Sequence, residues 1–243
     1  MNWRQRGSLW CLRPGRARGL VEFIGGSYLA ATPQISYRRF LETLAAQDLI
    51  VHAWSYVPGF DHQAQANEAW RAFRQGREAV DQQPRILRLG HSLGCKLHLL
   101  APDNGRNCSA LAALSFNNFS AERSVPLLAE LGPRLGVSSE FSPSPQETLE
   151  LVGRTYQQER NLLVRFQRDG LDQSARLLQV LQGRQGDQSA LLERPGDHLS
   201  PASAGLRQNL LGRWADDPAR QREMEQLAGQ ICRWWLGPDQ TRS

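Results

Sequence analysis

The chain has 243 residues, of which 40% are hydrophobic and 22% are charged. This balance fits one globular domain with a sizeable core, and it excludes a fibre, a repeat array and a wholly disordered chain. The formal net charge of +5 comes almost entirely from arginine. Because the arginines are scattered and form no aromatic-basic stripe, we expect no nucleic-acid partner.

The cysteine pattern and the hydropathy indicate the cellular compartment. Cys11, Cys95, Cys108 and Cys232 lie far apart, without a CxxC pair or a histidine cluster beside them. Neither a metal site nor a disulfide framework is indicated, and a reducing, cytoplasmic location is expected. No secretory signal is found, nor any run of the ~20 apolar residues that a membrane span needs. We therefore expect a soluble protein without a transmembrane segment; peripheral membrane contact and the oligomeric state stay open.

Apolar runs bounded by glycine, proline or polar residues predict buried strands, and apolar residues that recur every three or four positions predict helices. The first half is predicted to hold strands over 20–24, 48–56, 85–89 and 109–116, with helices over 33–47, 62–81 and 92–100. The second half is predicted to hold strands over 161–166 and 189–194 and helices over 174–182 and 218–235. This alternation predicts an α/β fold with a mostly parallel central sheet and helices on both faces.

The segment 117–159 differs from the rest of the chain in texture. Its FSPSPQ stretch is rich in proline and serine, and no strand is predicted within it. We expect one or two short helices there, which would form a cap or lid inserted into a single domain spanning 1–243.

Residues 90–94 read GHSLG, which fits the pattern Gly-x-Ser-x-Gly. At this composition the pattern arises by chance in roughly one chain in eight, so it is weak evidence by itself. Its setting is more informative, because it follows a predicted strand and opens a predicted helix, as a nucleophile elbow requires. Gly90 and Gly94 would relieve the crowding of such a strained turn. Ser92 is therefore the expected nucleophile.

A serine hydroxyl becomes a good nucleophile only when a base takes its proton and a carboxylate orients that base. In this architecture the order along the chain is Ser, acid, His. His198, in RPGDHLSP, directly follows the last predicted strand, whereas His98 lies within the elbow helix. The acid should follow the preceding strand. Asp169 is favoured because it comes first after that strand, and Asp172 is the alternative, although it could instead cap the next helix.

Acyl chemistry also needs two backbone donors for the developing oxyanion. One should be the N–H of Leu93, the residue after the nucleophile. The other should come from the turn GGSY after the first predicted strand. There Gly26 lets the backbone approach closely and Ser27 or Tyr28 would present its N–H. A plain glycine turn is the alternative interpretation.

These residues together resemble the α/β-hydrolase superfamily, and within it the uncharacterised domain-of-unknown-function family 1350 of cyanobacteria and plant plastids. The resemblance runs from about Ser8 to Trp235. It rests on seven stretches in the same order, FIGGSYLAATPQISYRRFLETLA, GFDHQAQANEAW, GHSLG, LSFNNFSA, FSPSPQET, RDGLDQS and GDHLSP.

The resemblance implies an α/β-hydrolase fold with Ser92, His198 and one of the two aspartates at the triad positions. Asp61 and His62 match a family-specific pair that would line the site, with helix capping by Asp61 an equally good explanation. Relatives often carry a histidine where this chain has Glu22, close to the predicted oxyanion turn.

We expect a serine hydrolase of the esterase, lipase or thioesterase kind, in which Ser92 attacks a carboxylic ester or thioester. The partner would be a small acyl substrate, lipid-like ones included, and no metal or organic cofactor is needed. The alternative is a catalytically silent hydrolase-fold protein that serves as a binding or assembly factor, linked to photosynthetic membranes by the family's distribution. Acyl transfer to an alcohol or amine is a third interpretation, and it would require a cap that excludes water.

Overall fold

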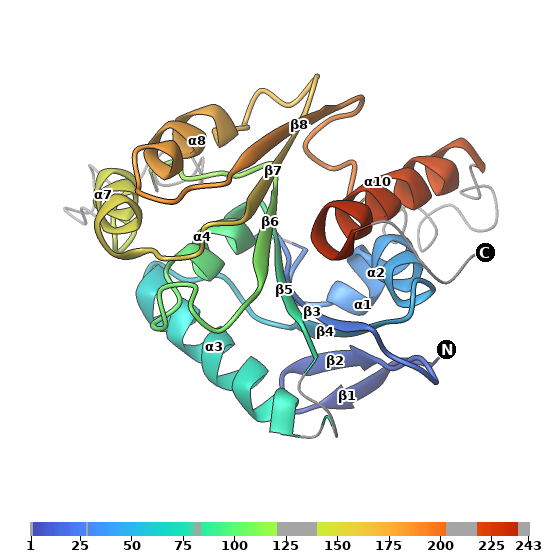
Figure 1. Ribbon diagram of the computed structural model, residues 1–243. Helices are drawn as coiled ribbons and strands as arrows, with labels where there is room; N and C mark the ends of the chain where they lie inside the picture. The colour runs from blue at the N-terminus through green and yellow to red at the C-terminus, as the bar shows by residue number, and fades with distance from the viewer. Residues whose placement is uncertain are drawn as a thin grey trace, which may run out of the picture.

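A computed structural model describes residues 2–27, 29–78, 80, 84–120, 140–202 and 218–237. These residues form an eight-stranded sheet with the strand order β1-β2-β4-β3-β5-β6-β7-β8 (Figure 1). The strands are β1 (Arg4–Arg6), β2 (Leu9–Leu12), β3 (Gly19–Ile24), β4 (Leu49–Trp54), β5 (Ile86–His91), β6 (Ala110–Leu114), β7 (Asn161–Phe166) and β8 (Ala190–Arg194).

Strands β3 to β8 are mutually parallel, and every residue of β3, β4 and β6 is buried. Near-continuous apolar runs such as LIVHAW and ALAAL are expected where helices cover both faces of a parallel sheet. The sequence-based prediction of a mostly parallel sheet is therefore confirmed.

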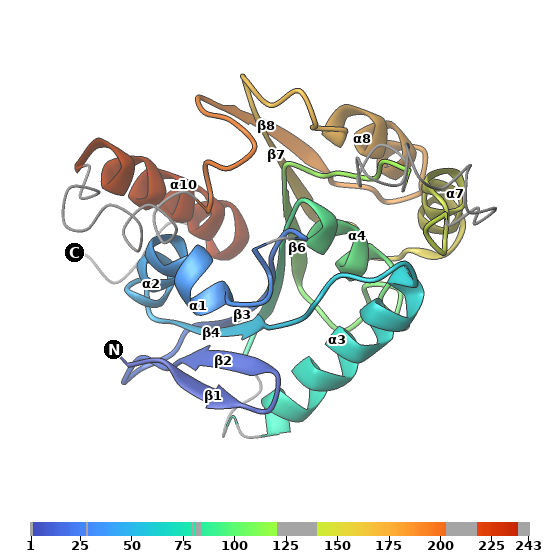
Figure 2. The same ribbon diagram turned by 180° about the vertical axis from the view of Figure 1, so that it is seen from behind.

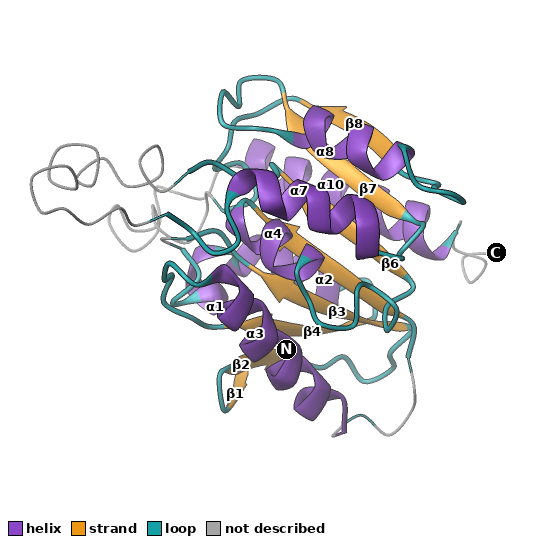
Figure 3. Cartoon of the chain, turned by 90° about the vertical axis from the view of Figure 1, so that its left-hand side faces the viewer, coloured by secondary structure: helices purple, strands orange, loops and turns teal. Residues whose placement is uncertain are grey.

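Helices cover both faces of this sheet (Figures 1 and 2). One face carries α1 (Pro33–Ser36), α2 (Arg38–Ala45) and α10 (Pro218–Leu236). The other carries α3 (His62–Glu78), α4 (Leu93–Leu99), α7 (Pro145–Thr155) and α8 (Ser174–Gln182), which stand in front of the strands in Figure 3. The buried apolar residues fall into one large cluster under α2 and α10 and two smaller ones under α3, α4, α7 and α8.

The sequence-based prediction missed the first two strands. β1 and β2 form an antiparallel hairpin, and β2 pairs antiparallel with β4. Their short lengths and the polar sequence RQR of β1 lack the apolar run by which strands were sought. Because all three residues of β1 are exposed at the sheet edge, its arginines oppose edge-to-edge pairing with another chain.

The helix predicted over 33–47 is two helices, and the break falls at Tyr37, which has φ −117° and ψ 17°. The interruption places the fully buried Tyr37 side chain against the turn after β3, where its hydroxyl is hydrogen-bonded. A tertiary contact thus divides a segment whose apolar spacing alone predicts one helix.

The cap expected over 117–159 falls partly on residues 121–139, which lie outside the described residues. In the described part of that segment, α7 begins with a capping box in which Ser144 and Glu147 bond to each other's backbone N–H. Within the described ranges, no helix combines the length and the apolar character that crossing a membrane would require.

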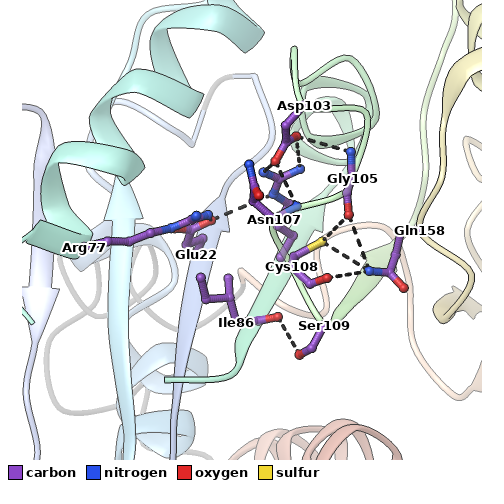
Figure 4. Close-up of polar contacts among 10 residues, drawn as sticks. Glu22, Arg77, Ile86, Asp103, Gly105, Asn107, Cys108, Ser109 and Gln158 are labelled. Atoms are coloured by element: carbon purple, nitrogen blue, oxygen red, sulfur yellow. Dashed lines mark hydrogen bonds and ion pairs between the residues drawn. The ribbon is translucent and has the colours of Figure 1, made fainter. Parts of the chain in front are cut away.

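A buried ion network ties β3 and β5 to the elements beside them (Figure 4). The Glu22 carboxylate accepts from Arg77 Nε and Nη2 at 2.6 and 2.8 Å. The Arg88 guanidinium bonds both oxygens of Asp103 at 2.8 and 2.7 Å and lies 3.9 Å from Glu22. The Asp103 carboxylate also accepts the backbone N–H of Gly105. Glu22 is therefore bonded within this network rather than at the turn after β3.

Candidate active site

Ser92 stands at a strained turn between β5 and α4. Its backbone has φ 55° and ψ −122°, a conformation that residues other than glycine rarely adopt. A Cβ at Gly94 would overlap the carbonyl of Ile24, and one at Gly90 would lie 2.6 Å from the backbone N of Cys95. These contacts explain why the turn needs glycine on both sides of Ser92.

Two side chains from distant loops extend a line of hydrogen bonds from the Ser92 hydroxyl. His198 Nε2 lies 3.0 Å from Ser92 Oγ, and His198 Nδ1 lies 2.8 Å from Asp169 Oδ2. Asp169 follows β7 and His198 follows β8, and the two loops are joined by the hydrogen bond from Arg168 N to Gly196 O. The structure thus brings Ser92, His198 and Asp169 into one line of hydrogen bonds.

The two candidate acids have different surroundings. Asp169 contacts His198, whereas both oxygens of Asp172 accept from Ser174, at 3.0 Å from its N–H and 2.8 Å from its hydroxyl. Burial raises the pKa of the Asp172 carboxyl despite the bonds from Ser174. Asp172 therefore accepts from the first residue of α8, one position before the N-cap Gln173, and no hydrogen bond joins it to His198.

The electrostatics favour an ionised Asp169. Burial alone would raise the pKa of its carboxyl, but hydrogen bonds from His198 and from the Leu171 N–H, together with the nearby polar side chain of Ser115, outweigh burial and lower the pKa. An ionised carboxylate only accepts, so Nδ1 of His198 must carry the proton that points to Asp169. In the tautomer with its proton on Nδ1, the ring presents the Nε2 lone pair to the Ser92 hydroxyl.

A second hydrogen-bonded line runs behind Ser92. His91 Nε2 lies 2.8 Å from the carbonyl oxygen of His198, and Nδ1 lies 2.8 Å from the Tyr37 hydroxyl. The Gly26 N–H donates to that hydroxyl at 2.8 Å. Burial lowers the pKa of His91 to about 3, so the ring is neutral. The carbonyl requires a donor at Nε2, so Tyr37 must donate to Nδ1 and every group in the line is satisfied.

The turn after β3 lies directly beside Ser92. A Cβ at Gly26 would come within 3.1 Å of the Ser92 Cβ, which shows how closely the two backbones approach. The Gly26 N–H is engaged by Tyr37, while the N–H groups of Ser27 and Leu93 have no hydrogen-bond partner in the described part of the chain. Tyr28, the other predicted donor of this turn, lies outside the described residues.

A pocket of about 410 Å³ opens at Ser92 and His198. Its walls are mostly apolar and include Leu29, Leu93, Phe119, Phe141, Leu171 and Leu199. Of the pair considered for site lining, His62 lines this pocket. Asp61 does not: it is exposed and caps α3, where its Oδ1 accepts from the Ala64 N–H at 2.8 Å.

Tyr37, His91 and Lys96 were not singled out from the sequence. Tyr37 carries no local signal, because its role depends on contacts with residues 11 and 54 positions away. Lys96 did carry one. It is the only lysine of the chain and follows Ser92 by four positions, the spacing that places two side chains on one face of a helix.

Comparison with solved structures identifies the architecture as the α/β-hydrolase fold. A monoacylglycerol lipase from Paleococcus ferrophilus matches 94% of this chain and 98% of its own length, with a TM-score of 0.59 and 16% identity. An esterase from Pyrococcus furiosus matches 94% of this chain and 86% of its own, with a TM-score of 0.62 and 14% identity. A thioesterase domain from the curacin biosynthetic pathway matches 86% and 97%, with a TM-score of 0.56 and 13% identity.

At the level of sequence, the chain belongs to the family described as "Protein of unknown function (DUF1350)", which matches residues 2–238. Comparison of the sequence with curated proteins gives no match. The family assignment confirms the resemblance noted from the seven sequence stretches.

Proposed function

We propose that this protein is a serine hydrolase that cleaves a carboxylic ester or thioester through an acyl-enzyme on Ser92. One observation carries the proposal: the line of hydrogen bonds from Asp169 through His198 to Ser92 Oγ, with distances of 2.8 and 3.0 Å. A nucleophile, its base and the group that orients the base are the parts that covalent acyl chemistry needs.

In the first half of the reaction, Ser92 Oγ attacks the carbonyl carbon while its proton passes to His198 Nε2. The carbonyl oxygen becomes an oxyanion, and the unpaired N–H groups of Leu93 and Ser27 would receive it. Asp169 stabilises the imidazolium that forms. The tetrahedral intermediate then collapses, and the leaving alcohol or thiol takes the proton from His198.

In the second half, water attacks the acyl-enzyme. His198 Nε2 accepts a proton from that water, so a second oxyanion forms in the same place. Its collapse breaks the bond to Ser92 Oγ, and His198 returns the proton to that oxygen. A carboxylic acid is released, and the enzyme regains its starting protonation state.

The structural neighbours support the proposal at the level of fold. The lipase and esterase that this chain resembles carry names that describe ester cleavage, and the curacin domain is named a thioesterase. Because one fold hosts many activities, the proposal depends on the side chains of the site. The pocket beside Ser92 has largely apolar walls. Such walls suit an acyl chain.

Labelling with a fluorophosphonate probe tests the proposal. The probe should modify the wild-type protein at Ser92, and the Ser92→Ala variant should resist labelling while melting at the same temperature. A panel of esters and thioesters of increasing acyl length should then show turnover that the variant lacks. Absence of both labelling and turnover would overturn the proposal and favour a binding or assembly role.

A further inference from the structure

The pocket beside Ser92 contains one buried positive charge. Lys96 lies on α4, four residues after Ser92, and only 1% of the residue is exposed. Its ammonium donates to the Pro143 carbonyl at 2.9 Å and lies 5.9 Å from the centre of the Phe141 ring. No carboxylate of the described residues lies within 4.0 Å of it. An ammonium has three donors, so two of them have no hydrogen-bond partner among the described residues.

His62 reaches the same corner of the pocket from the start of α3. Its ring stacks on Phe141 with a centroid separation of 4.2 Å, and the residue is 2% exposed. Neither ring nitrogen has a hydrogen-bond partner among the described residues. Phe141 therefore holds together two buried polar side chains whose hydrogen-bonding capacity is largely unused.

Burial sets the charge states of both groups. It lowers the pKa of Lys96 to about 8, with a partial offset from Glu140 and Glu147, so the amine is mostly protonated at neutral pH. Burial, and then the charge of Lys96, lower the pKa of His62 to about 3, so its ring is neutral and offers one N–H. A buried cation without a counter-ion is costly, and an anion bound beside it would remove that cost.

We propose that Lys96 and His62 bind a carboxylate of the substrate, so that the hydrolase acts on esters or thioesters that carry a carboxylate near the scissile carbonyl. This inference rests on the proposed function of Ser92. Both residues line the pocket that contains Ser92 and His198. The backbone of Lys96 stands about one helical turn, ~5.4 Å, beyond that of the nucleophile, and acyl groups of short dicarboxylic acids are the first ones to test.

Matched esters test the subsite by kinetics. The acyl pair is the p-nitrophenyl monoester of glutaric acid and p-nitrophenyl pentanoate, and the leaving-group pair is 4-carboxyphenyl butyrate and phenyl butyrate. The measured quantity is the ratio of kcat/KM for the charged ester to that for its neutral partner. Dividing by the neutral ester cancels any general damage to the site, and the two pairs identify which side of the scissile bond carries the carboxylate.

Two variants probe the charge and the ring. Lys96→Gln keeps an N–H donor for the Pro143 carbonyl but removes the charge, and His62→Phe keeps the stacking on Phe141 but removes the ring nitrogens. Loss of a hydrogen bond to a charged group predicts that Lys96→Gln lowers the ratio at least about tenfold for one of the pairs. Arg38→Gln removes an exposed positive charge on α2 and should leave the ratio unchanged. If Lys96 only supports the Pro143 loop, no ratio should change.

A binding measurement separates this inference from the proposed function. Because Lys96 is the only lysine, lysine labelled with ¹³C gives a single Cε resonance from the side chain. In the Ser92→Ala protein, glutarate should shift that resonance saturably and raise the Lys96 pKa from about 8, whereas neutral glutaramide should not. Saturable shifts without any ester turnover would retain the subsite and overturn the hydrolase. Turnover through Ser92 with unchanged ratios and no glutarate shift would overturn the subsite alone.

Discussion

Two polar clusters lie along strand β5, one at its middle and one just beyond its end. They differ in how many of their polar groups have a hydrogen-bond partner. Toward its middle, Arg88 joins Asp103 and Glu22 in the ion network, and each of the two carboxylates is held by an arginine at both of its oxygens. At its end, Ser92 is strained, and the nearby N–H groups of Ser27 and Leu93 have no described partner.

The contrast separates two uses of buried polarity. A buried ion pair whose partners satisfy each other holds a structure together, and breaking it leaves an uncompensated charge. Backbone N–H groups without a partner among the described residues call for an explanation. Under the proposed function, the donors beside the strained serine would receive the oxyanion of the substrate. Changes in the first cluster should therefore affect stability, and changes in the second should affect turnover.

The largest effect is expected for the acid of the site. Asp169→Asn should lower kcat about ten-thousandfold, because the amide would favour the wrong tautomer of His198. Ester hydrolysis by the purified variant, with its melting temperature, measures this effect.

Asp172→Asn is the matched control for this variant. It removes a carboxylate that accepts two hydrogen bonds from Ser174 at the start of α8, so it should cost about 1 kcal/mol of stability and change kcat only severalfold. Equal loss of activity in both variants would contradict the assignment of Asp169 as the orienting acid.

The ion network should show the opposite behaviour. Arg88→Met would leave the buried Asp103 carboxylate without its bidentate partner, and it should lower the free energy of unfolding by about 3–5 kcal/mol. Urea unfolding measures the loss, and fluorophosphonate labelling of the folded fraction should persist. Arg38→Met, which breaks the exposed pair with Glu42, should cost less than about 1 kcal/mol. Similar losses for the two variants would remove the distinction between the clusters.

Tyr37→Phe tests the line behind Ser92, because it removes the hydroxyl that serves both Gly26 and His91. The two unsatisfied groups should cost about 1–3 kcal/mol of stability, and displacement of the turn and of His198 should lower kcat about tenfold or more.

Tyr56→Phe provides the comparison, because its hydroxyl bonds to the carbonyl of Gly25 in the same turn at 3.0 Å but no described contact joins it to His91. It should lose stability with a smaller loss of kcat. Equal losses of kcat would show that His91 does not position the site.

The smallest effect concerns acid stability. Burial alone would raise the pKa of Asp103, but the Arg88 guanidinium and the N–H groups of Gly105 and Asn107 outweigh burial and lower it. A carboxyl whose pKa is lower in the folded state contributes stability that is present above the ordinary aspartate value, ~3.9. That stability is lost as the pH falls through the folded-state pKa.

Urea unfolding between neutral pH and about pH 3 should therefore show a falling midpoint. The fall should be shallower in Asp103→Asn, which removes this titrating group. An equally steep fall in both proteins would assign the pH dependence to other carboxyls.

Much of the fold could be predicted from the sequence, because the strands that build the sheet centre are continuous apolar runs and the helices between them have regular apolar spacing. The hairpin of β1 and β2 could not. The polar strand β1 exists only because β2 beside it pairs with β4. The break at Tyr37 escaped prediction for a similar reason, since the contacts that demand it come from β5 and the turn after β3.

The candidate site divides in the same way. Local sequence determined the turn at Ser92, because a strand, a glycine on each side of the serine and a following helix are all read within a few residues. The order of acid and histidine along the chain was also visible in the sequence. Only the tertiary structure decided that Asp169 contacts His198 while Asp172 bonds to Ser174 at the start of α8. The two aspartates lie three positions apart in one loop, and the sequence does not show which of their side chains points toward His198.

The pocket is the part that the sequence alone did not determine. His62, Lys96 and Phe141 come from separate segments, and only folding brings them against one another beside Ser92. The line from Gly26 through Tyr37 and His91 to His198 likewise includes a direct hydrogen bond between residues 107 positions apart, His91 and His198. The local sequence pattern indicates which residues prefer a strand, a turn or a helix. The pairing of buried polar groups depends instead on contacts between distant segments, and these contacts form only when the sheet has formed.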